Sequence, residues 1–509
     1  MSISSAISTA QQIFNNTGTQ TSVTSTNIAN TQNANYAKRT AVLVSNGSGA
    51  LVAMTSREQN QPLLRQTIAS TSLASGQSTL ATGLEEIRSL LGGNDYETSM
   101  STKMTALLNN IGAYAAKPSE ATLASTVVSS AQDVVNTLNT TSSELQAIRA
   151  RADAEIKTQV DKLNNLLGQF ETANTAIMQA EAIGKQNNDA LDTRDSLVKQ
   201  ISEITGVSST IRAGNDMALY TSDGTTLFET IPRTVGFTAT KTYTAAMTGS
   251  AVTIDGVAVK AGVGGDTSAS GSLQALLQIR DDVAPKYQSQ LDEMARGLIT
   301  AFAEALPSDP EGTFGAIAGL FTYKDASGVE QFDVPASGMV DHDYDNDGII
   351  DATLPGSSGL GGRIMVNSAL VPPTGVPTLL RDGGINGDAS YEWNTNKDSS
   401  YSALLDRYVQ MMQANQSFDE ISGGTDIDLM SYASDSTGWL EALRSSSTTA
   451  TETKSAMQSR AAEALSSETG VSLDEELSLL LDIEQSYKAA TKLVSTIDEM
   501  ISALMNAAG

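Results

Sequence analysis

The sequence predicts a mainly α protein with inserted β structure. Its parts are paired N- and C-terminal coiled-coil helices, a helical-bundle rod and an outward β-rich domain. Three observations predict this fold class. The stretch 471–509 has an apolar heptad repeat, and the first 30 residues place apolar side chains at helical spacing. Between these ends, long helical patterns alternate with two stretches rich in glycine, proline and strand-forming residues.

The C-terminal repeat is the strongest of these signals. Alternate steps of three and four residues reach positions that are all apolar or aromatic except Glu476, namely Leu473, Glu476, Leu480, Ile483, Tyr487, Ala490, Val494, Ile497, Ile501 and Leu504. Most charged residues fall off this seam, and Ser472 with Glu475 has the spacing of a capping box. A single helix cannot bury such a stripe alone, so a partner helix is required.

The N-terminus offers that partner. Ile3, Ile7 and Ile13 lie at helical spacing, and the pattern resumes with Ile28 after Gly18. If the two ends pair, the middle of the chain loops out. The alternative is that each end is an ordinary amphipathic helix packed on a globular domain. Ser, Thr and Asn are abundant at the N-terminus and are mediocre helix formers, so we expect this helix to be marginal in the free monomer.

The domain boundaries follow the changes of pattern. Residues 1–60 and 466–509 are predicted to form the terminal coiled-coil domain, with a short hairpin or extended arm within 31–60. The rod is predicted from three helical stretches, which are 61–205, 271–306 and 400–465. Pro62 suits a first helical turn, and Gly92 and Gly93 suit a helix stop.

The β-rich stretches are 206–270 and 307–399. Asp223-Gly224 and Asp255-Gly256 each stand between short apolar runs, which predicts two hairpins, and Ile364 begins a strand. The two stretches are either separate domains or two halves of one outer domain. We favour one domain, because the order helix, β, helix, β, helix suits a rod with an outward bulge.

Composition excludes several classes of function. With 31 basic and 58 acidic residues the formal charge is −27, so neither nucleic acid nor an anionic membrane is an expected partner. The chain has no cysteine, which excludes disulfides and thiolate chemistry. It has neither an apolar run long enough to span a membrane nor a secretory signal, because the first 37 residues lack both a basic start and a continuous apolar core. These features taken alone indicate a cytoplasmic protein.

The sequence shows no pattern typical of an enzyme. His342 is the only histidine, and it lies among aspartates that would raise its pKa. No glycine-rich phosphate loop precedes a helix, and the chain is therefore predicted to have no catalytic residues and no organic cofactor.

One local pattern indicates a metal. Asp343, Asp345, Asp347 and Asp351 match the first, third, fifth and ninth positions of a calcium loop, with Gly348 at the sixth. The twelfth position is Leu354, so the usual bidentate carboxylate is missing. The alternatives are a structural calcium site and an acidic turn without a metal.

Three motifs resemble the flagellar axial proteins, the family of rod, hook and hook-associated subunits. The N-terminal motif is Ser25-Thr26-Asn27-Ile28-Ala29-Asn30-Thr31 with Tyr36-Ala37-Lys38-Arg39, and the C-terminal motif is 470–477. The stretch 188–197 resembles the N-x-L-x-D-x-R-D-x-L segment of the hook-associated subunits at the junction of hook and filament. Asn35 stands where the family has glycine; since Asn tolerates left-handed backbone angles, we expect the turn to survive.

The resemblance implies a structural subunit of the flagellum that joins hook to filament by packing of its terminal helices. It implies self-association in a helical tube, contacts with hook protein and a neighbouring hook-associated protein, an export chaperone, type III secretion and an extracellular location. The assembly interface would include the following residues: Ile3, Ile7, Ile13, Asn27, Ile28, Asn30, Tyr36, Leu473, Leu480, Ile483, Tyr487, Val494, Ile497, Ile501 and Leu504. Asn27, Asn30 and Tyr36 can equally be cap and turn residues. The alternative functions are another axial protein (flagellin or hook protein) and a secreted calcium-binding surface protein or adhesin.

Overall fold

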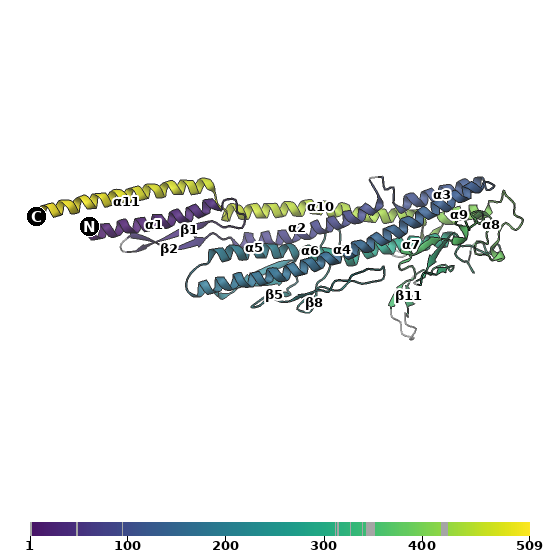
Figure 1. Ribbon diagram of the computed structural model, residues 1–509, viewed down its shortest axis with the longest axis horizontal. Helices are drawn as coiled ribbons and strands as arrows, with labels where there is room; N and C mark the ends of the chain where they lie inside the picture. Colours follow the sequence, from purple (N-terminus) through teal and green to yellow (C-terminus); the bar gives the residue numbers. More distant parts are fainter. Residues whose placement is uncertain are drawn as a thin grey trace.

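The computed structural model describes residues 3–508, except 47–48, 94, 311, 313–314, 326, 338, 343–351 and 419–425. The molecule is a long rod of helices that run along one axis (Figure 1). Both chain termini lie at the same tip, and the second β-rich stretch lies toward the opposite end. The predicted fold class, mainly helical with small inserted sheets, is confirmed.

The tip is built from the two ends of the chain. It comprises helix α1 (Ile3–Ala29), the strands β1 (Arg39–Asn46) and β2 (Gly49–Arg57), and helix α11 (Leu473–Ala508). Helices α1 and α11 lie side by side and antiparallel, and the β1–β2 hairpin lies beneath α1 (Figure 1). Gly18 does not interrupt α1. We call these four elements the terminal unit.

The rod consists of long helices from distant parts of the sequence. They are α2 (Gln61–Arg88) with the short turn η1 (Ser89–Leu91), α3 (Met100–Ala116), α4 (Ala121–Ala182), α5 (Asn188–Ile204), α6 (Ser272–Gln278), the π-helical turn η3 (Ile279–Val283), α7 (Ala284–Ala301), α9 (Ala403–Gln413) and α10 (Leu429–Thr469). The Asn60 side chain caps α2 by accepting from the Leu63 amide, and Pro62 lies in the first turn as predicted. After η1, Gly92 turns the chain with a φ of 90°.

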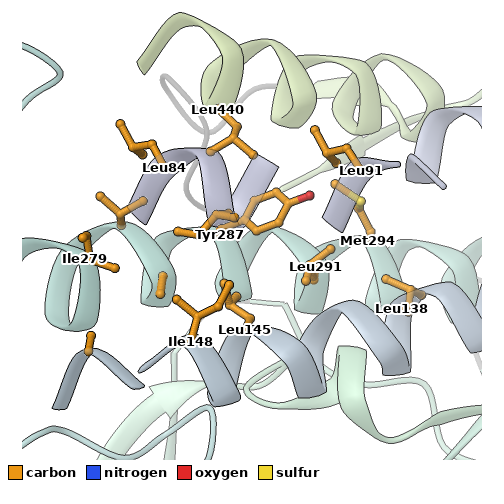
Figure 2. Packing of buried hydrophobic residues seen from close by; sticks show 14 of the residues in the cluster. Leu84, Leu91, Leu138, Leu145, Ile148, Ile279, Tyr287, Leu291, Met294 and Leu440 are labelled. Carbon is orange, nitrogen blue, oxygen red and sulfur yellow. The ribbon is translucent and has the colours of Figure 1, made fainter. Parts of the chain in front are cut away.

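A continuous apolar core holds these helices together. Leu84 of α2, Leu145 of α4, Leu291 of α7 and Leu440 of α10 all point into one layer (Figure 2), and each of them is fully buried. The four helices come from four separate stretches of sequence. Removal of this apolar surface from water therefore brings these four distant stretches of the chain together in one rod.

The first β-rich stretch forms two small antiparallel sheets. One has the order β3 (Val207–Ile211), β4 (Met217–Thr221), β5 (Thr226–Phe228), and the other β6 (Val235–Gly236), β7 (Thr253–Ile254), β8 (Val257–Ala258). Both predicted hairpins are present. At the second turn Asp255 and Gly256 have φ values of 50° and 84°, as a two-residue hairpin turn demands.

The second β-rich stretch is more irregular. Its strands pair as β10 (Glu330–Gln331), β9 (Phe321–Lys324), β13 (Ile364–Val366), and as β11 (Met339–His342) with β12 (Ala352–Pro355); β14 (Asn415–Ser417) and β15 (Asp426–Asp428) follow α9. Short helical turns connect them: η4 (Leu360–Gly362), η5 (Ser368–Leu370), α8 (Leu379–Asp382) and η6 (Ala389–Tyr391), while η2 (Ala213–Asn215) belongs to the first stretch.

The two β-rich stretches do not share a sheet in the described part of the chain, and their grouping into one outer domain stays a prediction. Strands of each stretch pair only within that stretch. Most strands pair with a close sequence neighbour, because short connections favour local pairing. The first stretch lies alongside α4, and the second lies toward the end that carries α8 and α9 (Figure 1).

Buried polar contacts attach each β-rich stretch to the rod. On α4, the Asp153 carboxylate pairs with Arg280 of η3 at 2.6 Å, where both side chains are almost fully buried, and accepts a hydrogen bond from Tyr243. On α7, Asp292 accepts from the amides of Gly359 and Gly361. Burial raises the pKa of Asp292 to about 7, although these donors oppose the shift.

Helix boundaries differ from the predicted ones where capping was not recognised. Within the predicted helical stretch 400–465, helix α10 begins at Leu429, because Asp428 accepts hydrogen bonds from the Met430 and Ser431 amides and caps it. The helix predicted to reach Leu306 ends at Ala301. No helix among the described residues is long and apolar enough to cross a membrane.

Candidate assembly interface

The contact between α1 and α11 follows one half of the predicted heptad seam. Ile483, Ala490 and Ile497 are buried, with exposed fractions of 5%, 0% and 4%. The alternate seam positions are largely uncovered, since Tyr487 is 53% and Val494 42% exposed, and beyond Ile497 the seam is exposed at Leu504 as well, at 61%. Ring contact does occur at one of them, because Phe14 of α1 meets Tyr487 edge to face with centroids 5.1 Å apart. A single α1 therefore leaves an apolar stripe of α11 facing outward.

The predicted interface residues fall into three groups by exposure. Those buried in the chain itself are Asn27, Tyr36, Ile483 and Ile497. Those half-buried are Ile3, Ile13, Ile28, Asn30 and Leu480. Those exposed are Ile7, Leu473, Tyr487, Val494, Ile501 and Leu504. The exposed group is available to another molecule, whereas the buried group already has partners within the chain.

The turn after α1 is built around Asn27. Its side-chain oxygen accepts from the Tyr36 hydroxyl at 2.7 Å and from the Arg39 amide at 3.1 Å, and its amide nitrogen donates to the Arg39 carbonyl. The Arg39 guanidinium lies 4.8 Å from the centre of the Tyr36 ring. Burial raises the pKa of the Tyr36 hydroxyl. These contacts fix the path from α1 into β1.

Asn35 does not need the left-handed conformation that we expected. Among the described non-glycine residues with positive φ, Asn35 does not occur. Instead, the Asn33 side chain accepts from the Asn35 amide at 3.1 Å, and the Asn33 carbonyl accepts from Tyr36. The turn is kept by a side-chain acceptor rather than by a special backbone angle.

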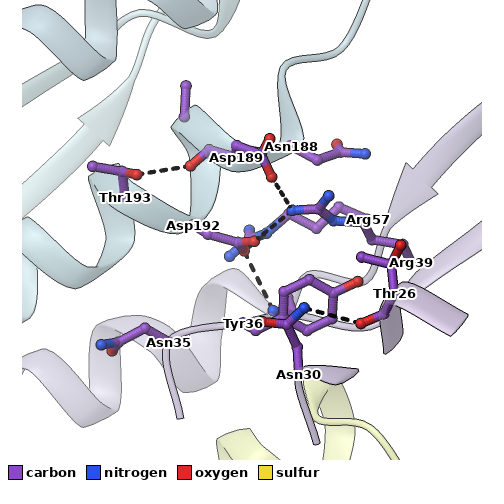
Figure 3. A network of polar contacts seen from close by, with 12 residues as sticks. Thr26, Asn30, Asn35, Tyr36, Arg39, Arg57, Asn188, Asp189, Asp192 and Thr193 are labelled. Atoms are coloured by element: carbon purple, nitrogen blue, oxygen red, sulfur yellow. Dashed lines mark hydrogen bonds and ion pairs between the residues drawn. The ribbon is translucent and has the colours of Figure 1, made fainter. Parts of the chain in front are cut away.

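The turn and the hairpin are joined to the start of α5 by an ionic cluster. Arg39 pairs with Asp189 at 2.5 Å and with Asp192 at 3.0 Å, and Arg57 pairs with Asp192 at 2.6 Å (Figure 3). Arg57 also pairs with Asp195 at 2.8 Å. We call these five residues the clasp. Hydrogen bonds to the carboxylates raise the pKa of Arg39 against the opposing effect of burial. Two further contacts support the clasp: Ala37 donates its amide to Asp192, and Asn188 donates to the Thr55 carbonyl.

Arg194, in the same motif, faces the other way. Its guanidinium donates to Asn174 of α4 and to the carbonyl and side chain of Asn215. Burial lowers its pKa. The aspartates and the arginine of this motif therefore contact different neighbours: the aspartates bind the terminal unit, and Arg194 binds α5 to α4 and η2.

The C-terminal motif meets the same point. The Lys38 amide donates to the Thr469 carbonyl at the end of α10, and the Lys38 ammonium pairs with Glu475 at 2.8 Å. The hydrogen bond to Glu475 raises the pKa of Lys38. The Glu475 carboxylate therefore binds Lys38 and does not complete the predicted capping box. The other half of that motif is present, because the Glu475 amide lies 3.5 Å from the Ser472 hydroxyl. Three motifs that are far apart in the sequence therefore meet where α1 ends and α11 begins, next to the rod.

Sequence reasoning missed the residues that join the motifs. Arg57 was not singled out, and Asp189, Asp192 and Asp195 were noted only as parts of a motif. A signal was present, since the aspartates recur every three residues along one face of α5 and the first charged residues of the chain are Lys38 and Arg39. Their pairing depends on the hairpin, whose register the sequence did not specify.

An open groove lies at the same place, between the terminal unit and the rod. It has a volume of about 1010 Å³ and is lined by the turn 30–38, the connections 58–60 and 470–472, and side chains of α2, α5 and α10. Lys199 of α5 lines it, and burial lowers the pKa of that lysine. The groove separates the terminal unit from the rod on the side where the chain passes between them.

The predicted calcium ligands cannot be placed. Asp343, Asp345, Asp347 and Asp351 lie outside the described residues, and the calcium site stays a prediction from the sequence. His342 ends strand β11, which pairs with β12. Within the described part of the chain, acidic residues and histidine do not gather into any group suited to a metal ion.

Two family models match the chain. Residues 84–319 match the flagellar hook-associated protein FlgK helical domain, and residues 464–507 match the flagellar basal body rod FlgEFG protein C-terminal model. The first match contains the clasp aspartates, and the second contains almost all of α11.

Individual relatives carry one consistent description. Flagellar hook-associated protein 1 of Bacillus subtilis is 23% identical over 85% of this chain and 80% of its own length. The protein of the same name from Escherichia coli is 22% identical over 99% of this chain and 100% of its own length. The flagellar hook junction protein FlgK from Burkholderia pseudomallei has a similar fold, with a TM-score of 0.55 and 12% identity over 79% of this chain and 98% of that structure.

The fold and the converging motifs define a structural protein of the flagellar axial class. Within that class, the chain is similar to flagellar hook-associated protein 1, in its helical domain and, at low identity, over nearly its whole length. It is therefore a flagellar component that assembles with other axial proteins.

Proposed function

We propose that this chain is a non-enzymatic subunit that joins the flagellar hook to the filament and is built into the axial tube by its terminal helices. The observation that carries the proposal is the half-covered seam of α11. Ile483, Ala490 and Ile497 bury one side of it against α1, while Tyr487, Val494 and Leu504 remain exposed. Exposed apolar stripes of this kind mark interaction sites.

Repetition explains how such a stripe assembles a tube. Each copy offers the uncovered stripe of α11 and the uncharged outer face of α1 to the copies beside, above and below it. A heterologous contact repeated with a fixed rise and rotation gives a helical tube. In this proposal, the hook protein and a neighbouring hook-associated protein continue the same packing at the two sides of the junction.

The proposal includes the route out of the cell. The uncharged N-terminal stretch, rich in Ser, Thr, Asn and Gln, acts as the signal for type III export, and a chaperone accompanies the subunit until it is exported. The protein then works outside the cell as part of the flagellum. The chaperone is needed because the monomer exposes an apolar stripe of α11.

The test uses cells that lack their own copy of the protein. The full chain should restore filaments. A chain that ends before Val471 keeps the N-terminal signal and the rod, so it should be exported but leave hooks without filaments. A matched control with Leu481→Ser, which changes another exposed side chain of α11 off the seam, should restore filaments. Filaments formed by the shortened chain would overturn the proposal, as would normal filaments in cells without the protein.

A further inference from the structure

Helix α6, the π turn η3 and helix α7 form one continuous helix with a single irregular turn. In η3 the Ala284 amide donates to the Ile279 carbonyl, five residues back rather than four. Pro285 follows directly, and proline has no amide hydrogen to donate. This leaves the Arg280 carbonyl without an amide donor. Its α-helical donor would be the Ala284 amide, which is already used, and its π-helical donor would be Pro285.

Arg149 of α4 supplies the missing donor. Its Nε atom donates to the Arg280 carbonyl at 3.0 Å. The other two nitrogens of the same guanidinium donate to the Thr244 and Met247 carbonyls. Both of these residues belong to the loop 237–252, which joins β6 to β7. One side chain of the rod therefore binds the π turn and a loop of the first β-rich stretch at once.

The Arg149 charge depends on these carbonyls. The side chain is only 2% exposed, and its acceptors in the described part of the chain are three carbonyls and the Gln146 side-chain oxygen. A buried charge is costly unless polar partners compensate it. If the loop 237–252 moves away, the guanidinium loses two of these acceptors and is drawn toward water.

The π turn also faces helix α2. Ile279 is 3% exposed and belongs to the apolar layer shown in Figure 2. It packs directly over Gly83 of α2, where any larger side chain would collide with it. If η3 gave up its extra residue, α6 would rotate by roughly 100° relative to α7. Ile279 would then leave its position on α2.

We propose that Arg149 couples two parts of the molecule, so that the π turn is kept only while the loop 237–252 is docked on the rod. With the loop docked, Arg149 satisfies the Arg280 carbonyl. With the loop detached, the Arg280 carbonyl loses its donor, which removes a support of the π turn and of Ile279 on α2. A neighbouring molecule that binds the first β-rich stretch would thereby act on the rod. The inference does not depend on the function proposed above.

Amide hydrogen exchange of the full chain, read by mass spectrometry, tests the coupling. Arg149→Met keeps the stem of the side chain and removes its donors. We expect the amides of 237–252 and of 279–284 to exchange about tenfold faster, because an unsatisfied buried carbonyl is costly. The decisive variant adds Pro285→Ala, which returns an amide to the helix. In this double variant 279–284 should regain slow exchange, whereas 237–252 should stay fast.

Arg151→Met is the matched control. Arg151 lies on the same helix, is exposed and pairs with Glu86, so its loss should leave both segments unchanged. If Arg149→Met does not fold, Arg149→Lys takes its place, because a single ammonium does not reproduce the fork of donors that a guanidinium provides. The proposal is overturned if 279–284 keeps its slow exchange in the folded Arg149 variant, or if Pro285→Ala fails to restore it.

Discussion

The Asp192 carboxylate lies 2.6 Å from the Arg57 Nε atom, although 135 residues separate the two in sequence. The contact joins strand β2 of the terminal unit to helix α5 of the rod. It explains why a motif in the middle of the chain accompanies motifs at its two ends: the aspartates of 188–197 bind the hairpin that follows the first motif. The Lys38 amide reaches the third motif's neighbour, Thr469, at 2.8 Å.

Packing along the seam predicts that two substitutions in α11, each of which truncates a side chain of four carbons to alanine, have unequal effects on local stability. Ile483→Ala removes a side chain that is 5% exposed and should cost about 2–4 kcal/mol of local stability, because it leaves a cavity against α1. Leu481→Ala removes a side chain that is 61% exposed and should change stability by less than about 0.5 kcal/mol. Amide hydrogen exchange of α1 and α11 in the monomer measures both. Equal effects would show that α1 does not cover the seam.

Amide hydrogen exchange should also show that the terminal unit opens more readily than the rod. Among the side chains that the structure describes in α11, only Glu476, Ile483, Ala490 and Ile497 are buried, whereas α4 has buried residues along its whole length. Few buried contacts mean a low free energy of local opening. We expect the amides of α1 and α11 to exchange much faster than those of α4. Slow exchange at both ends of the chain would contradict an interface that is completed only by neighbouring copies.

The ion pair of Asp153 and Arg280 should matter for the stability of the rod. Asp153→Ala leaves Arg280 buried without its carboxylate from α4, which should cost about 3–5 kcal/mol and lower the unfolding temperature. Asp161→Ala on the same helix removes an exposed partner of Lys157 and should cost no more than about 0.5 kcal/mol. Calorimetry of both variants gives the comparison, and a similar small loss in each would mean that the buried pair is not a significant attachment.

Asp292 should make stability depend on pH. Burial raises its pKa to about 7, whereas an unfolded aspartate has a pKa of about 3.9. The folded state therefore holds the proton more tightly, and this contribution to stability is complete below about pH 4 and is lost as the pH rises through about 7. Unfolding temperatures of the wild type and of Asp292→Asn are compared over that range.

The variant loses one of the acceptors for the Gly359 and Gly361 amides and should be less stable at every pH, yet its stability should fall less between about pH 4 and pH 7. Parallel curves for the two proteins would show that Asp292 titrates normally.

Much of the fold could be predicted because its signals are local. The period of 3.5 along 473–504 indicates a helix that needs a partner, and Asp255-Gly256 indicates a tight hairpin, and both are present. The start of α10 within the helical stretch 400–465 was not specified, because Gly438 and Ser436 weaken the helical pattern just after the Asp428 cap. The sheets of the second β-rich stretch were not predictable in detail, since pairs such as β9 with β13 depend on distant parts of the chain.

The site was predicted in part. Tyr36, Asn27 and the seam of α11 were recognised, but the pattern could not tell which seam positions α1 covers, because that depends on how a single partner lies across a wide stripe. Nor could it bring Arg57 to Asp192, since a shift of one residue in the hairpin would turn Arg57 to the other face. Whether the exposed members of the seam contact neighbouring copies remains a prediction.

That contact can be measured directly in assembled flagella. Because the chain has no cysteine, Val494→Cys and Leu504→Cys introduce single reactive sites on the exposed stripe of α11, which is 42% exposed at Val494. We predict that short bifunctional cross-linkers applied to isolated flagella join these cysteines to neighbouring subunits, whereas the dilute monomer gives no such product. Flagella that contain the variants but yield only uncross-linked chains at both positions would contradict the account.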